Sequence, residues 1–192
     1  MTTLRHFNFR SGHPVSYLEG TGREVKRIML NIENSSVNWQ HVSLWSPIEE
    51  DTAIVGDCFY ASIIFMSQAI MGGMKNLTLK TGIFDFNGED IYHCWIKHST
   101  LGQKFVINVS NLLLPGQNIK IFPQKFYKEQ NKVKRIIQRI PDKDFKASAI
   151  KFGTIKQEDN EYTVELDVSK FTKHLLAPTL TELDNYISTP KL

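Results

Sequence analysis

The stretch GDCFYASIIFMSQAI, residues 56–70, is apolar on nearly every side of a helical projection, which predicts a buried central helix over 58–71. Asp57 is a favoured N-cap residue, and two consecutive glycines follow the run as a typical helix end. Cys58, one of two cysteines, falls in the first turn. It is therefore either a small buried apolar residue or a thiol placed at a helix N-terminus for chemistry.

Three strand-like segments follow this helix. They cover residues 77–86, 91–98 and 104–109, and the turn sequences NGED and STLGQ separate them. Short breaks of this kind predict an antiparallel meander. Together with the helix, they indicate an α+β fold in which a central Cys-bearing helix packs on an antiparallel β-sheet with flanking helices.

Further elements are expected on either side of this core. Residues 21–34 carry apolar side chains at helical spacing, with Thr21 as N-cap and Glu24 completing a capping box. Residues 122–140 form an amphipathic basic segment, which predicts a helix ending at Pro141. We also expect a β-hairpin from 145–155 and 161–168, and a short helix over 177–188.

Length and composition restrict the class of protein. A chain of 192 residues with 41% hydrophobic and 22% charged residues is typical of a single globular domain, 1–192. No run is apolar enough to cross a membrane, and the N-terminus lacks the apolar core of a signal peptide. We therefore expect a cytoplasmic protein, with secretion by a signal-free route as the open alternative. Two cysteines are too few for a disulfide framework or a thiolate zinc site, and we expect neither a metal nor a cofactor.

Three polar residues occur in an order that suits nucleophilic catalysis. Cys58 begins the buried helix, His93 lies on the second strand, and Asn108 ends the third. A helix N-terminus favours a thiolate, an imidazole can take and return a proton, and a third polar group can fix the ring.

Pairing within the last hairpin links two of these residues. If the turn is centred between Thr100 and Leu101, His93 lies directly opposite Asn108. Strand alternation then places Trp95 on the face of His93, and Cys94 on the other face, away from the site.

These residues resemble a known group of enzymes. GDC at a helix start, HCWI on a strand and FVIN on the next strand are similar to the core of the transglutaminase-like, papain-related cysteine enzymes. The resemblance covers residues 54–110 and implies that Cys58 is the nucleophile, His93 the general base and acid, and Asn108 the orienting residue. It also implies a peptide or protein substrate. From the sequence itself we expect no association with a membrane, and nucleic acid is the less favoured partner.

Parts of this pattern differ from the family. Asn108 stands where transglutaminase-like members usually have Asp, although papain-like enzymes use Asn. Trp95, Trp45 and Gln40 are the candidates for substrate binding, the last two also for the missing oxyanion-hole donor. A protease, a deamidase and a transglutaminase all remain compatible with these residues, and hydrolysis is preferred because water needs no second substrate site. The stretch GDCFYAS also resembles the nucleophile motif of ovarian-tumour-type deubiquitinases, but this resemblance ranks lower because their His lies much further downstream.

Other interpretations compete with catalysis. Cys58 could be an ordinary core residue, and His41 or His174 could replace His93 as the base, whereas we expect His98 at its turn to be solvated. Residues 119–151 carry ten Lys and Arg against three Asp and Glu. The alternative function is therefore a non-enzymatic module that engages a protein or nucleic-acid partner through the basic 119–139 segment. Its basic residues in the expected helix are Lys125, Lys128, Lys132, Lys134, Arg135 and Arg139.

Overall fold

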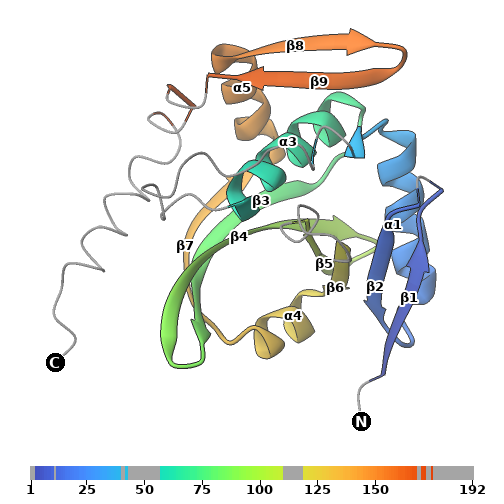
Figure 1. Cartoon of the computed structure of the whole chain (residues 1–192), viewed down its shortest axis with the longest axis vertical. Helices are drawn as coiled ribbons and strands as arrows, with labels where there is room; N and C mark the ends of the chain where they lie inside the picture. Colours follow the sequence, from blue (N-terminus) through green and yellow to red (C-terminus); the bar gives the residue numbers. More distant parts are fainter. Residues whose placement is uncertain are drawn as a thin grey trace, which may run out of the picture.

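The computed structural model describes residues 3–10, 12–39, 42, 57–109, 119–167, 170–171 and 174. Within these residues it contains four helices, a seven-stranded sheet and a separate two-stranded sheet (Figure 1). The helices are α1 (Gly22–Asn34), α3 (Asp57–Met71), α4 (Gln124–Gln130) and α5 (Asp142–Phe152). The strands are β1 (Leu4–Asn8), β2 (Pro14–Leu18), β3 (Leu77–Phe86), β4 (Glu89–Thr100), β5 (Gln103–Asn108), β6 (Ile119–Pro123), β7 (Val133–Pro141), β8 (Gly153–Glu158) and β9 (Glu161–Leu166).

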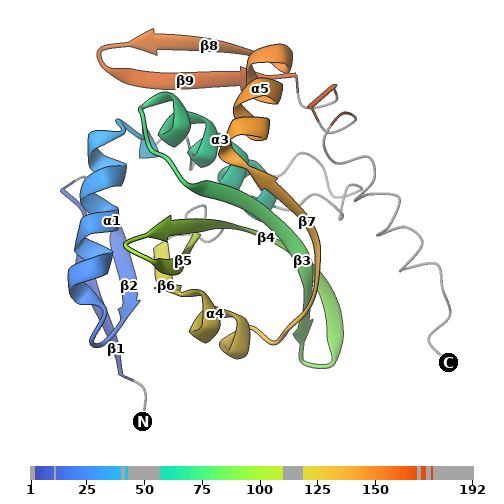
Figure 2. The ribbon, with the colours of Figure 1, turned by 180° about the vertical axis from the view of Figure 1, so that it is seen from behind.

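The large sheet is mostly antiparallel. Its strand order is β1-β2-β6-β5-β4-β3-β7, and β2 and β6 form its one parallel pair among the described strands. The central part is the predicted meander of β3, β4 and β5. Helix α3 lies on one side of this meander and α4 on the other (Figures 1 and 2). The α+β class and the central helix on an antiparallel sheet are therefore confirmed.

Two predicted elements are wrong. The basic segment 122–140 is not one helix: α4 ends at Gln130, Lys132 has a positive φ of 44°, and β7 begins at Val133. Because β7 pairs with β3 along its length, tertiary pairing overrides a pattern that also fits a helix. Likewise, residues expected as the first strand of a late hairpin form α5, and β8 and β9 make a shorter hairpin after it.

The predicted capping box of α1 is also wrong. Helix α1 does begin after Thr21, but the Thr21 side chain makes no cap hydrogen bond. Its hydroxyl instead donates to the Leu18 carbonyl at 2.6 Å. Thr21 thus fastens the helix start to the end of β2. The predicted helix over 177–188 lies outside the described residues.

The register of the β4–β5 hairpin differs from the expected one by two residues. Thr100 pairs with Gln103 across a two-residue turn, in which Leu101 and Gly102 have φ values of 50° and 73°. Positive φ at both central residues is the condition for a type I′ hairpin turn. A shift of two residues keeps every side chain on its expected face, whereas a shift of one would have reversed them.

The two faces of the sheet carry separate apolar clusters. The α3 face has the larger one, built from α1, α3 and sheet residues such as Cys94, Ile96 and Ile107. The α4 face has a smaller cluster. Its fully or largely buried members are Phe84, Trp95, Val106, Phe122 and Tyr127. The alternation of β4 therefore assigns its even-numbered residues from Tyr92 to Ile96 to the α3 face, and His93 and Trp95 to the α4 face.

None of the described helices is both long and apolar enough to cross a membrane.

Candidate active site

Cys58 lies in the first turn of α3 and is 9% exposed. It belongs to the cluster on the α3 face and interacts electrostatically with Tyr92 and Cys94 of β4. Ser62, one helical turn further on, lies beside the Cys94 thiol. The same side of the helix therefore presents Cys58 and Ser62 to β4.

The second cysteine has an environment that opposes reactivity. Burial raises the pKa of the Cys94 thiol well above its usual value, and the nearby Cys58 adds to this, while Ser62 only partly offsets it. Cys94 is fully buried. A thiol that stays protonated and inaccessible is a poor nucleophile, so Cys94 is a packing residue.

His93 and Asn108 are in direct contact. Their side chains share a hydrogen bond that favours the protonated imidazole, although burial outweighs it and lowers the pKa of His93 to about 4. The two residues meet diagonally, because the observed register puts Asn108 one position past the Ile96–Ile107 pair and therefore opposite Trp95. At neutral pH the ring is thus uncharged, able to accept a proton, and held by Asn108, which is itself 5% exposed.

The structure brings two of the three predicted catalytic residues together and places the third differently. Cys58 approaches β4 from the α3 face, beside Cys94. The His93 ring lies on the α4 face, where its centroid is 5.0 Å from that of Phe84 and 6.3 Å from that of Trp95. The thiol and the imidazole therefore approach the same strand from its two sides. Strand β4 has β3 on one side and β5 on the other. Among the described residues β5 pairs with β4 only from Ile96 onward, so at His93 the β5 side of β4 has no described strand neighbour.

Of the proposed substrate-binding residues, only Trp95 is described. It is fully buried on the α4 face and packs between Phe84 and Tyr127. Trp95 therefore supports the strand as a core residue rather than lining an open site. Trp45 and Gln40 lie outside the described residues.

The alternative bases are placed as follows. His41 lies outside the described residues. His174 is exposed, and its ring packs on Phe152 at 5.0 Å between centroids. This contact with Phe152, at the end of α5, is the ring contact of His174 in the described structure.

One charged neighbour of His93 was not foreseen. Lys120 of β6 pairs with Asn108 of β5, and its charge further lowers the pKa of His93. Lys120 lies on the same face as the His93–Asn108 pair because directly paired residues share a face. No element predicted from the sequence includes Lys120, because the helix expected over 122–140 overlaps only the end of β6. Recognising this neighbour requires residues 119–123 to be identified as a strand.

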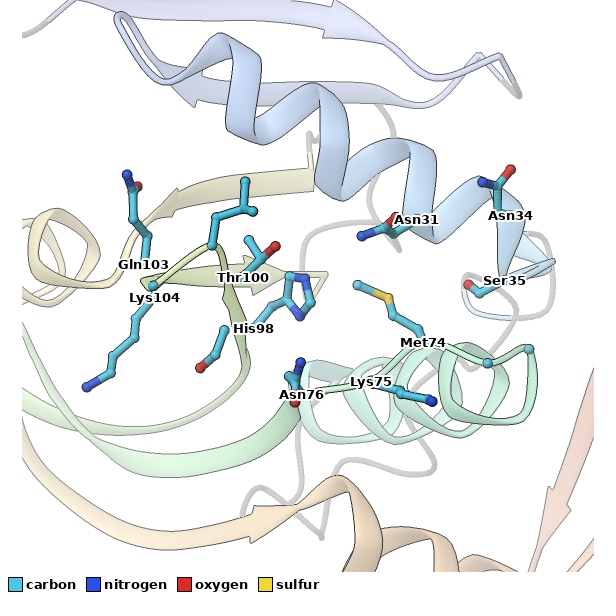
Figure 3. A pocket seen from close by; sticks show the side chains of 15 residues that line it. Asn31, Asn34, Ser35, Met74, Lys75, Asn76, His98, Thr100, Gln103 and Lys104 are labelled. Carbon is cyan, nitrogen blue, oxygen red and sulfur yellow. The ribbon is translucent and has the colours of Figure 1, made fainter.

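A cavity of about 740 Å³ lies at the other end of the β4–β5 hairpin. The ends of α1 and α3 and the hairpin turn line it, and the side chains of Asn31, Met74, His98 and Thr100 point into it (Figure 3). No Asp or Glu is among its described lining residues. Cys58, His93 and Asn108 are not among them either, so this cavity is separate from the predicted catalytic residues.

His98 contradicts the expectation that it is solvated. It is 3% exposed, and burial lowers the pKa of its ring. Neither ring nitrogen reaches a partner with hydrogen-bond geometry in the described part, although the carbonyls of Asn76 and Lys75 lie close enough to favour protonation. His98 was placed at a turn in the sequence, but the strand extends to Thr100 and carries it into the protein interior.

Neither a search for metal-binding side chains nor comparison with known proteins identifies a further feature of the site. No cluster of three or more His, Cys, Asp or Glu side chains suitable for a metal ion occurs among the described residues. No protein-family model, no curated protein and no solved structure matches this chain.

Proposed function

We propose that this protein is a thiol-dependent hydrolase of peptide or side-chain amide bonds that acts through an acyl-enzyme. Cys58 is the nucleophile, His93 the general base and acid, and Asn108 the residue that positions the His93 ring. The observation that supports this most directly is the side-chain hydrogen bond between His93 and Asn108. A half-buried imidazole held by a buried amide supplies a base and its orienting group, and the Cys58 helix packs against the same strand.

The reaction would proceed in two halves. The Cys58 sulfur attacks the amide carbonyl carbon while its proton passes to His93, and backbone N–H groups at the start of α3 stabilise the oxyanion. Collapse of this intermediate breaks the carbon–nitrogen bond, and His93 returns the proton to the leaving amine. Water then attacks the thioester, with His93 as base, and releases the acid and the thiol.

The arrangement of the strand restricts how these groups can meet. Since Cys58 and His93 approach β4 from its two faces, they can act together only around the edge of β4 beside Asn108. The proposal therefore predicts that His93 alters the reactivity of Cys58 but not that of Cys94.

Alkylation of the two cysteines tests this directly. The protein is treated with iodoacetamide at about pH 6.5, and each modified cysteine is quantified by mass spectrometry after digestion. Cys58 should react at least about tenfold faster than Cys94, and H93A should slow Cys58 by a similar factor. The matched control is H98A, which removes a buried histidine from the same strand, outside the proposed site.

Two results would count against the proposal. Equal and slow labelling of both cysteines would show that Cys58 is a core residue, and equal effects of H93A and H98A would show that only packing had changed.

A second assay uses glutamine-containing peptides with methylamine present. A cleaved chain, a deamidated glutamine or a methylamine adduct then separates protease, deamidase and transglutaminase activity, each abolished by C58A.

A further inference from the structure

The basic residues of this protein are regrouped by the fold. The sequence places most of them in one segment, but within that segment Lys134 forms an ion pair with Asp90 at 2.5 Å and lies 3.8 Å from Asp85. Another basic residue of the segment, Arg139, lies on β7 and pairs with Lys80 of β3, which is outside the segment. The segment is thus not one continuous cationic surface.

The centre of the new grouping is Lys80 on β3. It pairs with Arg139 of β7, and Thr78, the residue two positions before it, pairs with Lys97 of β4. Lys104 lies two residues before the partner of Lys97 on β5. Since directly paired residues and residues two apart share a face, these four cationic side chains lie on the α4 face.

Helix α4 adds a fifth cation. The Lys80 ammonium donates to the Gln124 side-chain oxygen at 3.3 Å, which fixes the side of α4 that faces the sheet. Lys128 follows Gln124 by one helical turn and so projects from the same side. Lys125, in contrast, is exposed and lies on another side of the helix.

The burial of Lys80 among other cations disfavours its charged form. Lys80 is 6% exposed, and its pKa is lowered to about 8, first by burial and then by the charges of Lys128, Lys97, Arg139 and Lys104. All the charges that act on it in the described structure are positive. A cation buried among cations needs a compensating anion, and the described residues do not supply one.

Two hydrogen-bond donors buried on the same face also lack an acceptor, as expected near a site for an anion. The Trp95 indole nitrogen and the Tyr127 hydroxyl are buried beneath α4 and make no hydrogen bond to described residues. Both can donate a hydrogen bond. The interior of this face therefore holds two donors without a described acceptor.

We propose that the α4 face binds a phosphate-bearing ligand through Lys80, Lys97, Lys104, Lys128 and Arg139. Phosphate is favoured over a single carboxylate because a multivalent anion can compensate several cations and accept several hydrogen bonds at once. The phosphates could belong to a free phosphorylated compound or to a nucleic-acid backbone. This inference does not depend on the proposed hydrolase activity.

Binding of two probes tests the site. Titration calorimetry in about 150 mM sodium chloride measures the affinity for sodium tripolyphosphate and, separately, for a short single-stranded oligothymidylate. Binding of either probe is expected, and K80M should weaken it about tenfold or more because the central charge is lost. Preference for tripolyphosphate assigns a small ligand, and preference for the oligothymidylate assigns a nucleic acid.

A matched pair on α4 separates a built site from general charge attraction. K128M and K125M each remove one lysine from the same helix, but only Lys128 faces Lys80. K128M should weaken binding by about threefold or more, and K125M by less than about twofold. If K80M does not fold, R139Q replaces it in the same comparison. Equal losses for K128M and K125M, or failure of both probes to bind the wild-type protein, would overturn the proposal.

Discussion

The two faces of the meander of β3, β4 and β5 differ in the side chains that they bury. The α3 face is covered by α1 and α3 and contains mostly aliphatic and aromatic side chains. The α4 face has a small aromatic centre under one seven-residue helix, with His93, Lys80 and their charged neighbours around it. Apolar burial on the α3 face supplies stability, although that face also buries His98, whereas the buried cation Lys80 on the α4 face costs stability. The two proposals made above both draw on the α4 face, and the proposed hydrolase also needs Cys58 from the α3 face.

The largest effect should come from emptying the centre of the α3 face. Phe65 is fully buried and packs against Trp39, so F65A should lower the free energy of unfolding by roughly 3–5 kcal/mol. Phe126, half-buried on α4 against Phe122, is the matched residue, and F126A should cost roughly 1–2 kcal/mol. Chemical denaturation measures both, and equal losses would break the distinction between the faces.

A smaller effect should appear in acid. The pKa of His93 is lowered to about 4 from 6.5, so the unfolded chain binds more protons than the native state between these values. Stability contributed by the neutral ring is present above about pH 6.5 and is lost as the pH falls toward 4, by roughly 1–3 kcal/mol. H93Q should flatten this part of the stability–pH curve. An unchanged curve would mean that the ring is solvated.

At alkaline pH the expected change comes from Lys80. Its pKa is lowered to about 8 from 10.5, so the native state gains stability as the pH rises from about 8 to 10.5. K80M, which keeps the aliphatic stem, should be more stable than the wild type at pH 7 by about 1–2 kcal/mol. The two proteins should converge above about pH 10.5. A K80M protein that is less stable at pH 7 would show that Lys80 is already compensated.

The smallest effect is expected at the ion pair of Lys134. This lysine is 44% exposed and pairs with Asp90, whose side chain is 8% exposed. K134A should cost about 0.5–1 kcal/mol at low salt and less at high salt, because exposed ion pairs are weak and screened. A loss as large as that of F126A would make this ion pair as important to stability as the aromatic centre of the α4 face.

Sequence patterns were sufficient where one physical signal dominated. The run from Cys58 to Met71 is too apolar for any surface element, and the three strands after it are bounded by clear turns. The segment 133–141 failed because its isoleucines fit both a helix and a strand, and only pairing with β3 decides between them. Strands β1 and β2 are short, and β2 joins the rest of the large sheet only by pairing with β6, far away in the sequence.

The candidate site could be predicted in part for a similar reason. Alternation along β4 is local, so the shared face of His93 and Asn108 followed from the sequence even with the register two residues off. The face covered by α3 was not predictable, because β4 is apolar on both sides near Cys94 and Trp95. Which of these residues meets the helix is decided by packing of the whole sheet.

The parallel pairing of β2 with β6 has a consequence for synthesis. Val15 pairs with Ile119, so the N-terminal hairpin has no partner in the large sheet until more than half of the chain has left the ribosome. The meander of β3, β4 and β5 needs only neighbouring segments and can form earlier. A nascent chain stopped before β6 would therefore present β2 as an open strand edge, the kind of surface that chaperones bind and that pairs with other chains when left uncovered.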